Sequence, residues 1–321
     1  WISGTKQSNI SAYVDQVSDK PLLSAKLSGG KVVSESKIPE IGVTEFKLSN
    51  GVKVVLKPTD FKNDEISFSA FSAGGSSLYS DADFQSALYA TAIIRNGGLG
   101  EFNSVQLPKL LSGKKVSVSP YITERFEGIS GSTSPKDIET ALQLTYLYFT
   151  QPRKDAETFK GLIAQQKGGL ANRGNDPNSV FADSVAAILG NYNVRRTGPS
   201  IEKINQVSLD RAFEIYKDRF ADASDFTFVF VGSFNPAELK PLLEQYLGSL
   251  PSSNRKETAK DLGIKIPAGK IDKKIYKGQE PKASVRLVFS GDYTWSEKHN
   301  NQLNALAEVL TIKLIERLRE D

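Results

Sequence analysis

The sequence predicts an α+β fold in which a mainly antiparallel sheet is covered by helices. The Asn50-Gly51 pair lies between two short runs of β-prone residues, which is the strongest local signal for a hairpin. Predicted strands and helices are segregated along the chain more than they alternate, as is typical of antiparallel sheets. The 321 residues, 39% hydrophobic and 24% charged, have the composition of a globular protein and leave room for two domains.

The folded part is expected to begin near Gly42. Residues 1–40 are rich in Ser, Lys, Gly and Pro and show no sustained hydrophobic period, so we interpret them as a linker. Two strands flank the Asn50-Gly51 turn. A third covers 65–75, where Ile66 and Phe68 alternate with serines and indicate a strand with one buried face.

Helical periodicity, turn residues and short apolar runs give the remaining elements of the first domain. Ser134-Pro135 marks the start of a helix that continues to Phe149, because Pro is favoured in a first helical turn. Further helices are predicted over 81–95, 104–111, 156–172, 179–189, 208–220 and 236–247, and further strands over 114–122, 125–133 and 225–234.

A second linker is predicted over 250–270, followed by strands over 273–278 and 283–291. Leucines at 303, 306, 310, 314 and 318 then form the stripe of an amphipathic helix. This order repeats the beginning of the first domain, so we interpret it as the start of a second, similar domain. No Gly, Asn or Pro ends the last helix, and the chain starts at Trp1, so we expect a fragment of a longer protein.

Composition excludes several classes of site. The chain has no Cys and a single His, His299, which excludes disulfides, thiol catalysis, Cys-based metal sites and any site needing two His. No apolar run is long enough to span a bilayer. The net charge of +4 comes from scattered residues without a basic stripe, which argues against a nucleic-acid partner.

Three glycine-rich stretches could suggest phosphate binding, and each has a simpler interpretation. SAGGSSLYSD (72–81) lacks the Lys-Ser or Lys-Thr that follows a phosphate loop, so we favour a tight turn between strand and helix. NGGLGEF (96–102) lacks dinucleotide spacing and is expected to end a helix. GKKVS (113–117) lacks the earlier Gly of a phosphate loop.

The charged candidates also have structural interpretations. Asp60, Asp64 and Glu65 around Lys62, and Asp222 with Asp225, are expected to act in turns, and His299 on the surface. The pairs Arg195-Arg196 and Arg317 with Arg319 could hold a carboxylate or a backbone carbonyl, although residues alone favour a solvated surface for them.

Several long stretches resemble one family. They are LSNGVKVVLKPTDFKNDEISFSAFSAGGSSLYSD, SPYITERFEGISGSTSPKD, TYLYFTQPRKDAETF, YKDRFADASDFTFVFVGSF and LAEVLTIKLIERLRE. Together they resemble the C-terminal half of insulinase/pitrilysin-type zinc metallopeptidases in their long bacterial form, a single chain of four homologous domains. The resemblance implies that 1–40 is the linker from a missing N-terminal half, 41–262 a peptidase-like domain, and 263–321 the truncated start of the next domain.

Active domains of this family carry His-x-x-Glu-His on the helix after the third strand, where two His bind zinc and the Glu activates water. The equivalent positions here are Leu88, Thr91 and Ala92, none of which can bind zinc. The helix that supplies a further Glu in the family has Gln165 and Gln166 instead. The resemblance therefore implies no catalytic residue and no metal on this chain, with zinc in the missing half.

The family's C-terminal half closes around a chamber and contributes an Arg, followed seven residues later by a Tyr, toward the substrate. LRED matches the start of that motif, which makes Arg319 the predicted substrate-binding residue, with its Tyr beyond Asp321. We therefore expect the non-catalytic half of a zinc endopeptidase that confines peptide substrates and is inactive alone. The alternative is an inactive binding or assembly module of a larger complex. The resemblance also implies a bacterial envelope, periplasmic location.

Overall fold

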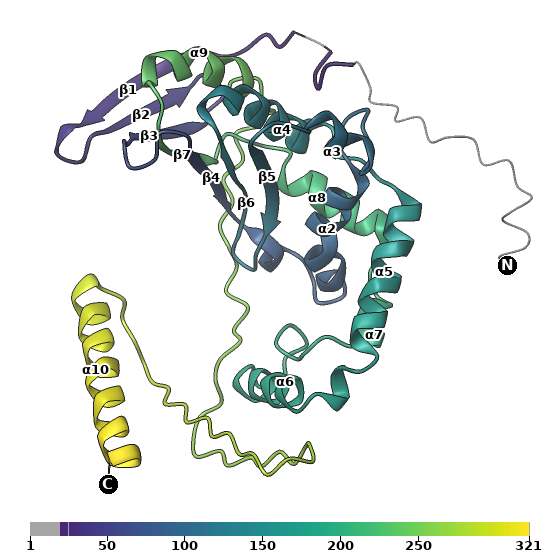
Figure 1. The fold of residues 1–321 in the computed structure, drawn as a ribbon, viewed down its shortest axis with the longest axis vertical. Helices are drawn as coiled ribbons and strands as arrows, with labels where there is room; N and C mark the ends of the chain where they lie inside the picture. Colours follow the sequence, from purple (N-terminus) through teal and green to yellow (C-terminus); the bar gives the residue numbers. More distant parts are fainter. Residues whose placement is uncertain (1–19, 25, 321) are drawn as a thin grey trace, which may run out of the picture. The chain divides into compact units, whose positions relative to one another are not determined.

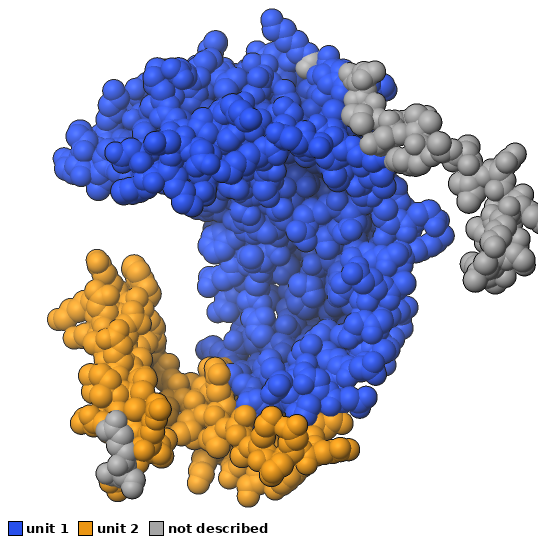
Figure 2. Space-filling view, in the orientation of Figure 1, with its two compact units in different colours: residues 1–265 blue, residues 266–321 orange. Residues whose placement is uncertain are grey.

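The computed structural model describes residues 20–24 and 26–320, and its chain forms two compact units, 1–265 and 266–321 (Figure 2). Unit 1 holds the sheet and most of the helices, and unit 2 holds one long helix (Figure 1). Each unit is described by itself.

Unit 1 is built on a seven-stranded sheet with the order β1-β2-β3-β7-β4-β6-β5 (Figure 1). Neighbouring strands are antiparallel except for β3 and β7, which run parallel. The mainly antiparallel α+β prediction is thus confirmed. The strands are β1 (Val32–Ile38), β2 (Val43–Leu48), β3 (Lys53–Pro58), β4 (Ile66–Ala73), β5 (Val116–Ile122), β6 (Phe126–Thr133) and β7 (Thr227–Gly232).

The predicted hairpin turn joins β2 to β3. Gly51 has φ +94°, a conformation that side chains with a Cβ rarely adopt. The Asn50 amide Nδ2 donates to the Leu247 carbonyl at 2.8 Å, which ties the turn to the chain after the last helix of unit 1.

The helices of unit 1 lie close to their predicted ranges, except for the short helix α7, which the sequence analysis did not predict. Side chains of Asp155, Asp176, Ser208 and Asn235 cap four of them by accepting backbone N–H groups of the first turn. The helices are α2 (Phe84–Gly97), α3 (Gln106–Leu110), α4 (Ile138–Thr150), α5 (Ala156–Leu170), α6 (Pro177–Leu189), α7 (Ile201–Ile204), α8 (Leu209–Arg219) and α9 (Pro236–Tyr246), with 3-10 turns η1 (Pro39–Ile41), η2 (Gly75–Leu78), η3 (Pro135–Asp137) and η4 (Arg173–Asn175).

One face of the sheet carries the core. Alternate residues of β4 and β7 are buried, and Phe68 stacks on Phe230 with ring centroids 5.3 Å apart. Above them, Phe149 of α4 packs edge-on against Phe220 and Phe226, at 5.1 and 5.0 Å. These buried rings bring strand β7, helix α4 and the end of α8 together.

The opposite face of β4, β6 and β5 carries short hydroxyl side chains. Strand register places six serines in two rows across the three strands, Ser67–Ser132–Ser117 and Ser69–Ser130–Ser119. All six are exposed or half-buried, whereas their neighbours Phe68 and Ala70 are buried. This face of the three strands is uncharged.

Two segments predicted as linkers take part in unit 1. Val32–Ile38, inside the predicted linker 1–40, forms β1 by pairing with β2, and Leu22, Leu23 and Leu27 pack against the core. The backbone of residues 253–260, inside the predicted linker 250–270, also contacts unit 1. Such long-range contacts leave no hydrophobic period, so composition alone could not show them.

Unit 2 contains helix α10 (Glu297–Ile315), continued by a π-helical turn η5 (Glu316–Glu320). The predicted helix is confirmed, and His299 is exposed near its start as expected. The strands predicted over 273–278 and 283–291 are absent from the structure. A hairpin is marginal without further strands or helices to pack on, and the described part of unit 2 offers no other strand. None of the described helices has the length and apolar character needed to cross a membrane.

We predict that Phe149→Ala lowers the free energy of unfolding by about 3–5 kcal/mol, because the truncation leaves a cavity among packed aromatic rings. The matched control is Phe61→Ala, since the Phe61 side chain is 90% exposed, and it should change stability by less than about 0.5 kcal/mol. Urea unfolding followed by circular dichroism measures both. Equal losses for the two variants would contradict this assignment of the core.

Candidate functional site

The structure brings together the two helices that would hold zinc in an active relative. Helix α2 carries Leu88, Thr91 and Ala92, and helix α5 carries Gln165 and Gln166. The Tyr89 hydroxyl of α2 lies 3.4 Å from Gln166 Oε1 of α5, so the two helices adjoin as the resemblance implies.

The side chains at these positions do not fit a metal ion. Leu88 is 53% exposed, and neither it nor Ala92 has a donor atom in its side chain. Zinc in proteins is bound by Cys, His and carboxylate side chains. Within residues 20–24 and 26–320, no group of three or more such side chains could hold a metal ion. We therefore derive no zinc chemistry for this chain.

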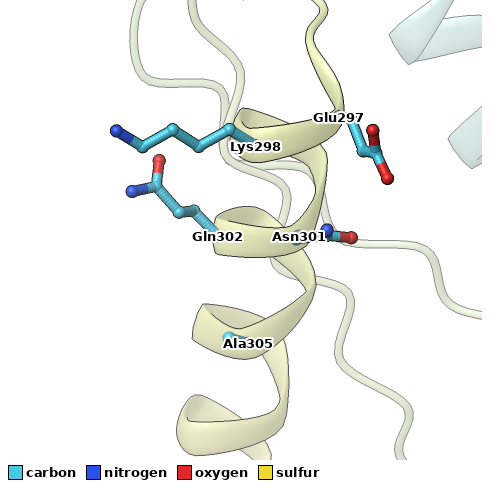
Figure 3. A pocket seen from close by; sticks show the side chains of 5 residues that line it. All are labelled: Glu297, Lys298, Asn301, Gln302 and Ala305. Carbon is cyan, nitrogen blue, oxygen red and sulfur yellow. The ribbon is translucent and has the colours of Figure 1, made fainter.

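Arg319 lies exposed in the π-helical turn after α10. A depression of about 560 Å³ opens elsewhere on the same helix and is lined by Glu297, Lys298, Asn301, Gln302 and Ala305 (Figure 3). All five residues belong to the first turns of α10, so the depression is an open helix surface without Arg319.

The turn after β4 is a structural junction. An added Cβ on Gly75 would lie 2.4 Å from the Thr123 carbonyl oxygen, so only glycine fits. The backbone N–H groups of Ser76 and Ser77 donate to the carbonyls of Thr123 and Glu124, both at 2.8 Å. Because these N–H groups are already paired, the turn interpretation of SAGGSSLYSD is confirmed over the phosphate-binding one.

The Arg195 side chain also binds this turn. The prediction that Arg195 lies on a solvated surface is wrong. Its side chain is only 2% exposed and donates to Asp81 Oδ1 at 2.6 Å and to the carbonyls of Ser76 and Tyr79 at 3.0 and 2.6 Å. Arg196 binds the Glu124 carboxylate. The backbone carbonyls of the tight turn can accept further hydrogen bonds, because each has two lone pairs. A guanidinium group can donate several hydrogen bonds to such carbonyls at once.

The main charged site of unit 1 surrounds Arg219, at the end of α8. We call it the Arg219 cluster and define it as Tyr79, Glu127, Asp218, Arg219 and Glu257. Arg219 donates to the Tyr79 hydroxyl at 2.8 Å, to Asp218 Oδ2 at 2.8 Å and to both Glu257 oxygens at 2.9 and 3.2 Å. Glu127 Oε1 lies 3.6 Å from Arg219 Nη1, and both side chains are 2% exposed. The cluster joins four separate segments of the chain.

Charge and burial compete within the cluster. Burial raises the pKa of Glu127 to about 7, although the Gly75 N–H at 2.5 Å and the Arg219 guanidinium favour its charged form. Burial acts in the same direction on Asp218, yet hydrogen bonds from Tyr79 and Arg219 outweigh it and lower the pKa to about 2. Burial and the bond to Asp218 raise the pKa of Tyr79. One carboxyl therefore titrates near neutral pH while its neighbour stays ionised.

Sequence reasoning missed the Arg219 cluster. The signal was present, because Ala212, Ile215, Tyr216 and Arg219 share the buried face of α8 and only Arg219 is charged. A charge on an otherwise apolar stripe indicates a buried ion pair. Glu127 and Glu257 carry no comparable signal, since one lies in a strand and the other in a predicted linker.

Of the acidic candidates, Asp222 has the predicted turn role. Its carboxylate accepts the backbone N–H groups of Ser224 and Arg255 at 2.8 and 2.6 Å. Glu65 pairs with Lys62 at 2.9 Å, and Asp64 pairs with Lys115 at 2.7 Å, in surface pairs of small energetic value.

Comparisons with known proteins agree on one family. Residues 206–321 match the model of the peptidase M16 inactive domain. A "zinc protease PQQL-like" protein of Arabidopsis thaliana is 30% identical over 310 residues, covering 93% of this chain and 30% of the relative. A "probable zinc protease PqqL" of Haemophilus influenzae is 25% identical over 87% of this chain and 30% of its own length. The chain thus spans about 30% of the curated relatives it matches.

Solved structures share the fold. The periplasmic protease PqqL from Escherichia coli superposes with a TM-score of 0.67 at 21% identity, over 81% of this chain and 28% of that chain. The ferredoxin protease FusC, solved with Arabidopsis ferredoxin, gives 0.63 at 16% identity, over 80% and 29%. The first half of PqqL gives 0.54 at 15% identity, over 71% and 51%. The fold of this chain therefore also occurs in the first half of PqqL.

We predict that Glu127→Gln removes a pH dependence of stability. The raised pKa of Glu127 means that the folded protein binds more protons than the unfolded chain between about pH 4.5 and pH 7. The protonated Glu127 carboxyl therefore makes its full contribution to the free energy of unfolding below about pH 4.5. This contribution falls as the pH rises from about 4.5 and is lost as the pH passes through 7, with a slope of up to about 1.4 kcal/mol per pH unit.

Urea unfolding at several pH values between about 5 and 8 measures this effect. The curve for Glu127→Gln should be flatter than that of the unmodified chain, whereas exposed Glu40→Gln should leave the slope unchanged. If the Glu127→Gln slope equals that of the unmodified chain, the assigned titration is incorrect.

Proposed function

Because this chain belongs to the M16 peptidase family and carries its inactive domain, we propose that it forms the non-catalytic C-terminal half of a zinc-dependent endopeptidase. The zinc ion and the general base would lie in an N-terminal half that this sequence does not include. The observation that carries the proposal is the replacement of the ligand positions by Leu88, Thr91 and Ala92 on an otherwise retained helix pair.

In this proposal the chain confines peptide substrates. The uncharged face of β4, β6 and β5, with its two rows of serines, offers a surface without strong charge selectivity. Hydroxyl groups can both donate to and accept from a peptide backbone, so such a surface tolerates many sequences. Units 1 and 2 would correspond to the third domain, with the linker before it, and the start of the fourth.

Arg319 is the proposed substrate-binding residue, together with a Tyr beyond Asp321. A guanidinium carries five N–H donors and stays charged at physiological pH. Placed beside a scissile peptide bond, it would stabilise the oxyanion that develops in the transition state more than the uncharged carbonyl, which is the difference that accelerates the reaction. The exposed position of Arg319 is compatible with this role.

We further propose that the protein acts in the periplasm, with the N-terminal half as its partner. Support comes from the structurally similar PqqL of E. coli, which is a periplasmic protease.

We predict that Arg319→Ala in the full-length protein lowers kcat for a quenched fluorescent peptide by about 10²-fold or more, because one donor to the oxyanion is lost. Arg317→Ala, two residues earlier, is the matched control and should stay within a few-fold of the unmodified protein. The same comparison can be made by mixing a separately expressed N-terminal half with this chain extended beyond Asp321.

Two outcomes would contradict the proposal. Equal kcat values for the two Arg variants would remove the assigned role of Arg319. If the zinc-loaded, folded full-length protein cleaves no peptide, the alternative of an inactive binding or assembly module replaces the peptidase assignment.

A further inference from the structure

The chain leaves α9 and returns to the Arg219 cluster before it reaches unit 2. Residues 253–260, which we call the clasp, contain no helix or strand, yet five of their side-chain or backbone groups bond to distant parts of unit 1. Ser253 Oγ donates to Asp222 Oδ2 at 2.7 Å, and the Arg255 N–H donates to the same oxygen at 2.6 Å. The Lys260 N–H donates to Ser77 Oγ at 2.9 Å.

Two charged side chains of the clasp extend these contacts. Arg255 Nη1 donates to Asp218 Oδ1 at 2.9 Å, and Nη2 donates to the Asp218 carbonyl at 2.5 Å. Glu257 accepts two hydrogen bonds from Arg219. The clasp therefore reaches the end of α8, the loop before β7 and the turn after β4, which are all within unit 1.

Burial makes release of the clasp costly. The Arg219 side chain is 2% exposed and that of Glu257 is 25% exposed. Without Glu257, Arg219 would keep Asp218, Tyr79 and Glu127 but lose two charge-assisted bonds while remaining buried. Loss of charge-assisted bonds at a buried charge is destabilising, so the cluster favours the closed clasp.

We propose that the clasp fixes the point at which the chain leaves unit 1, with Arg255 and Glu257 as positioning residues. The free connection to α10 would then begin at residue 261 and not at 250, where the sequence suggests a linker. Residues 261–296, which the structure describes without helix or strand, form that connection. Only the effect of the clasp on substrate binding rests on the proposed function, because Arg319 lies in unit 2.

Amide hydrogen exchange tests the clasp directly in this chain. Glu257→Gln should raise exchange at the N–H groups of Arg255 and Lys260 by at least about tenfold, because both depend on the closed clasp. Lys256→Gln, at an exposed neighbouring position, is the matched control and should leave both rates unchanged. Amides of β4 and β7 should remain protected in both variants, which separates opening of the clasp from unfolding.

A distance measurement tests the consequence for unit 2. The chain has no Cys, so spin labels can be attached to single cysteines introduced at Lys136 and Gln302, both exposed. Glu257→Gln should broaden the distance distribution between the labels relative to Lys256→Gln. Tyr79→Phe keeps the ring and removes the hydroxyl's bonds to Arg219 and Asp218, neither of which is in the clasp, so it should broaden the distribution less.

The outcomes separate this inference from the proposed function. Unchanged exchange at Arg255 and Lys260 in Glu257→Gln would overturn the clasp, whatever the peptidase activity. Raised exchange without any broadening would overturn its role in fixing the exit point. Loss of peptide cleavage in Arg319→Ala leaves both readouts unaffected, because Arg319 lies outside unit 1.

Discussion

The arrangement of unit 1 depends on one buried guanidinium. Arg219 lies at the end of α8 among side chains from the turn after β4, from β6 and from the segment after α9. A buried charge has to be paired and hydrogen-bonded, so these segments must meet at one place if the protein is to fold. The tight Gly74-Gly75 turn leaves room for the Arg219 side chain, because glycine has no Cβ. Arg195 binds the same turn through the Ser76 carbonyl.

This arrangement gives a peptidase-like framework without metal-binding side chains at Leu88, Thr91 and Ala92. Helices α2 and α5 still adjoin through Tyr89 and Gln166, although zinc-binding side chains are missing. What holds the framework is its aromatic core and the Arg219 cluster, and neither needs a metal ion. In the proposed function this domain supplies surface and position to a partner that performs the chemistry.

The serine rows and the clasp are two features of unit 1 that require different kinds of contact. In the proposed function this sheet face has to avoid strong, selective contacts with peptides, and short hydroxyl side chains meet that need. With Arg319 as the proposed substrate-binding residue, unit 1 also has to control where the chain leaves it, and this calls for strong, specific contacts. The structure separates the two, with hydroxyls on the open face of the sheet and buried charges on the side of the helices.

Local pattern determined most of the fold. Asn50-Gly51 specified the hairpin, alternation in β4 specified the buried face, and Ser134-Pro135 marked a helix start. The sequence also determined that Leu88, Thr91 and Ala92 cannot bind zinc, because ligand chemistry depends on residue type alone. Only the tertiary structure decided that Val32–Ile38 forms an edge strand, that Arg195 is buried, and that Glu127 and Glu257 meet at Arg219. These features arise from contacts between residues far apart in the chain, and such contacts leave no periodicity in the sequence around either partner.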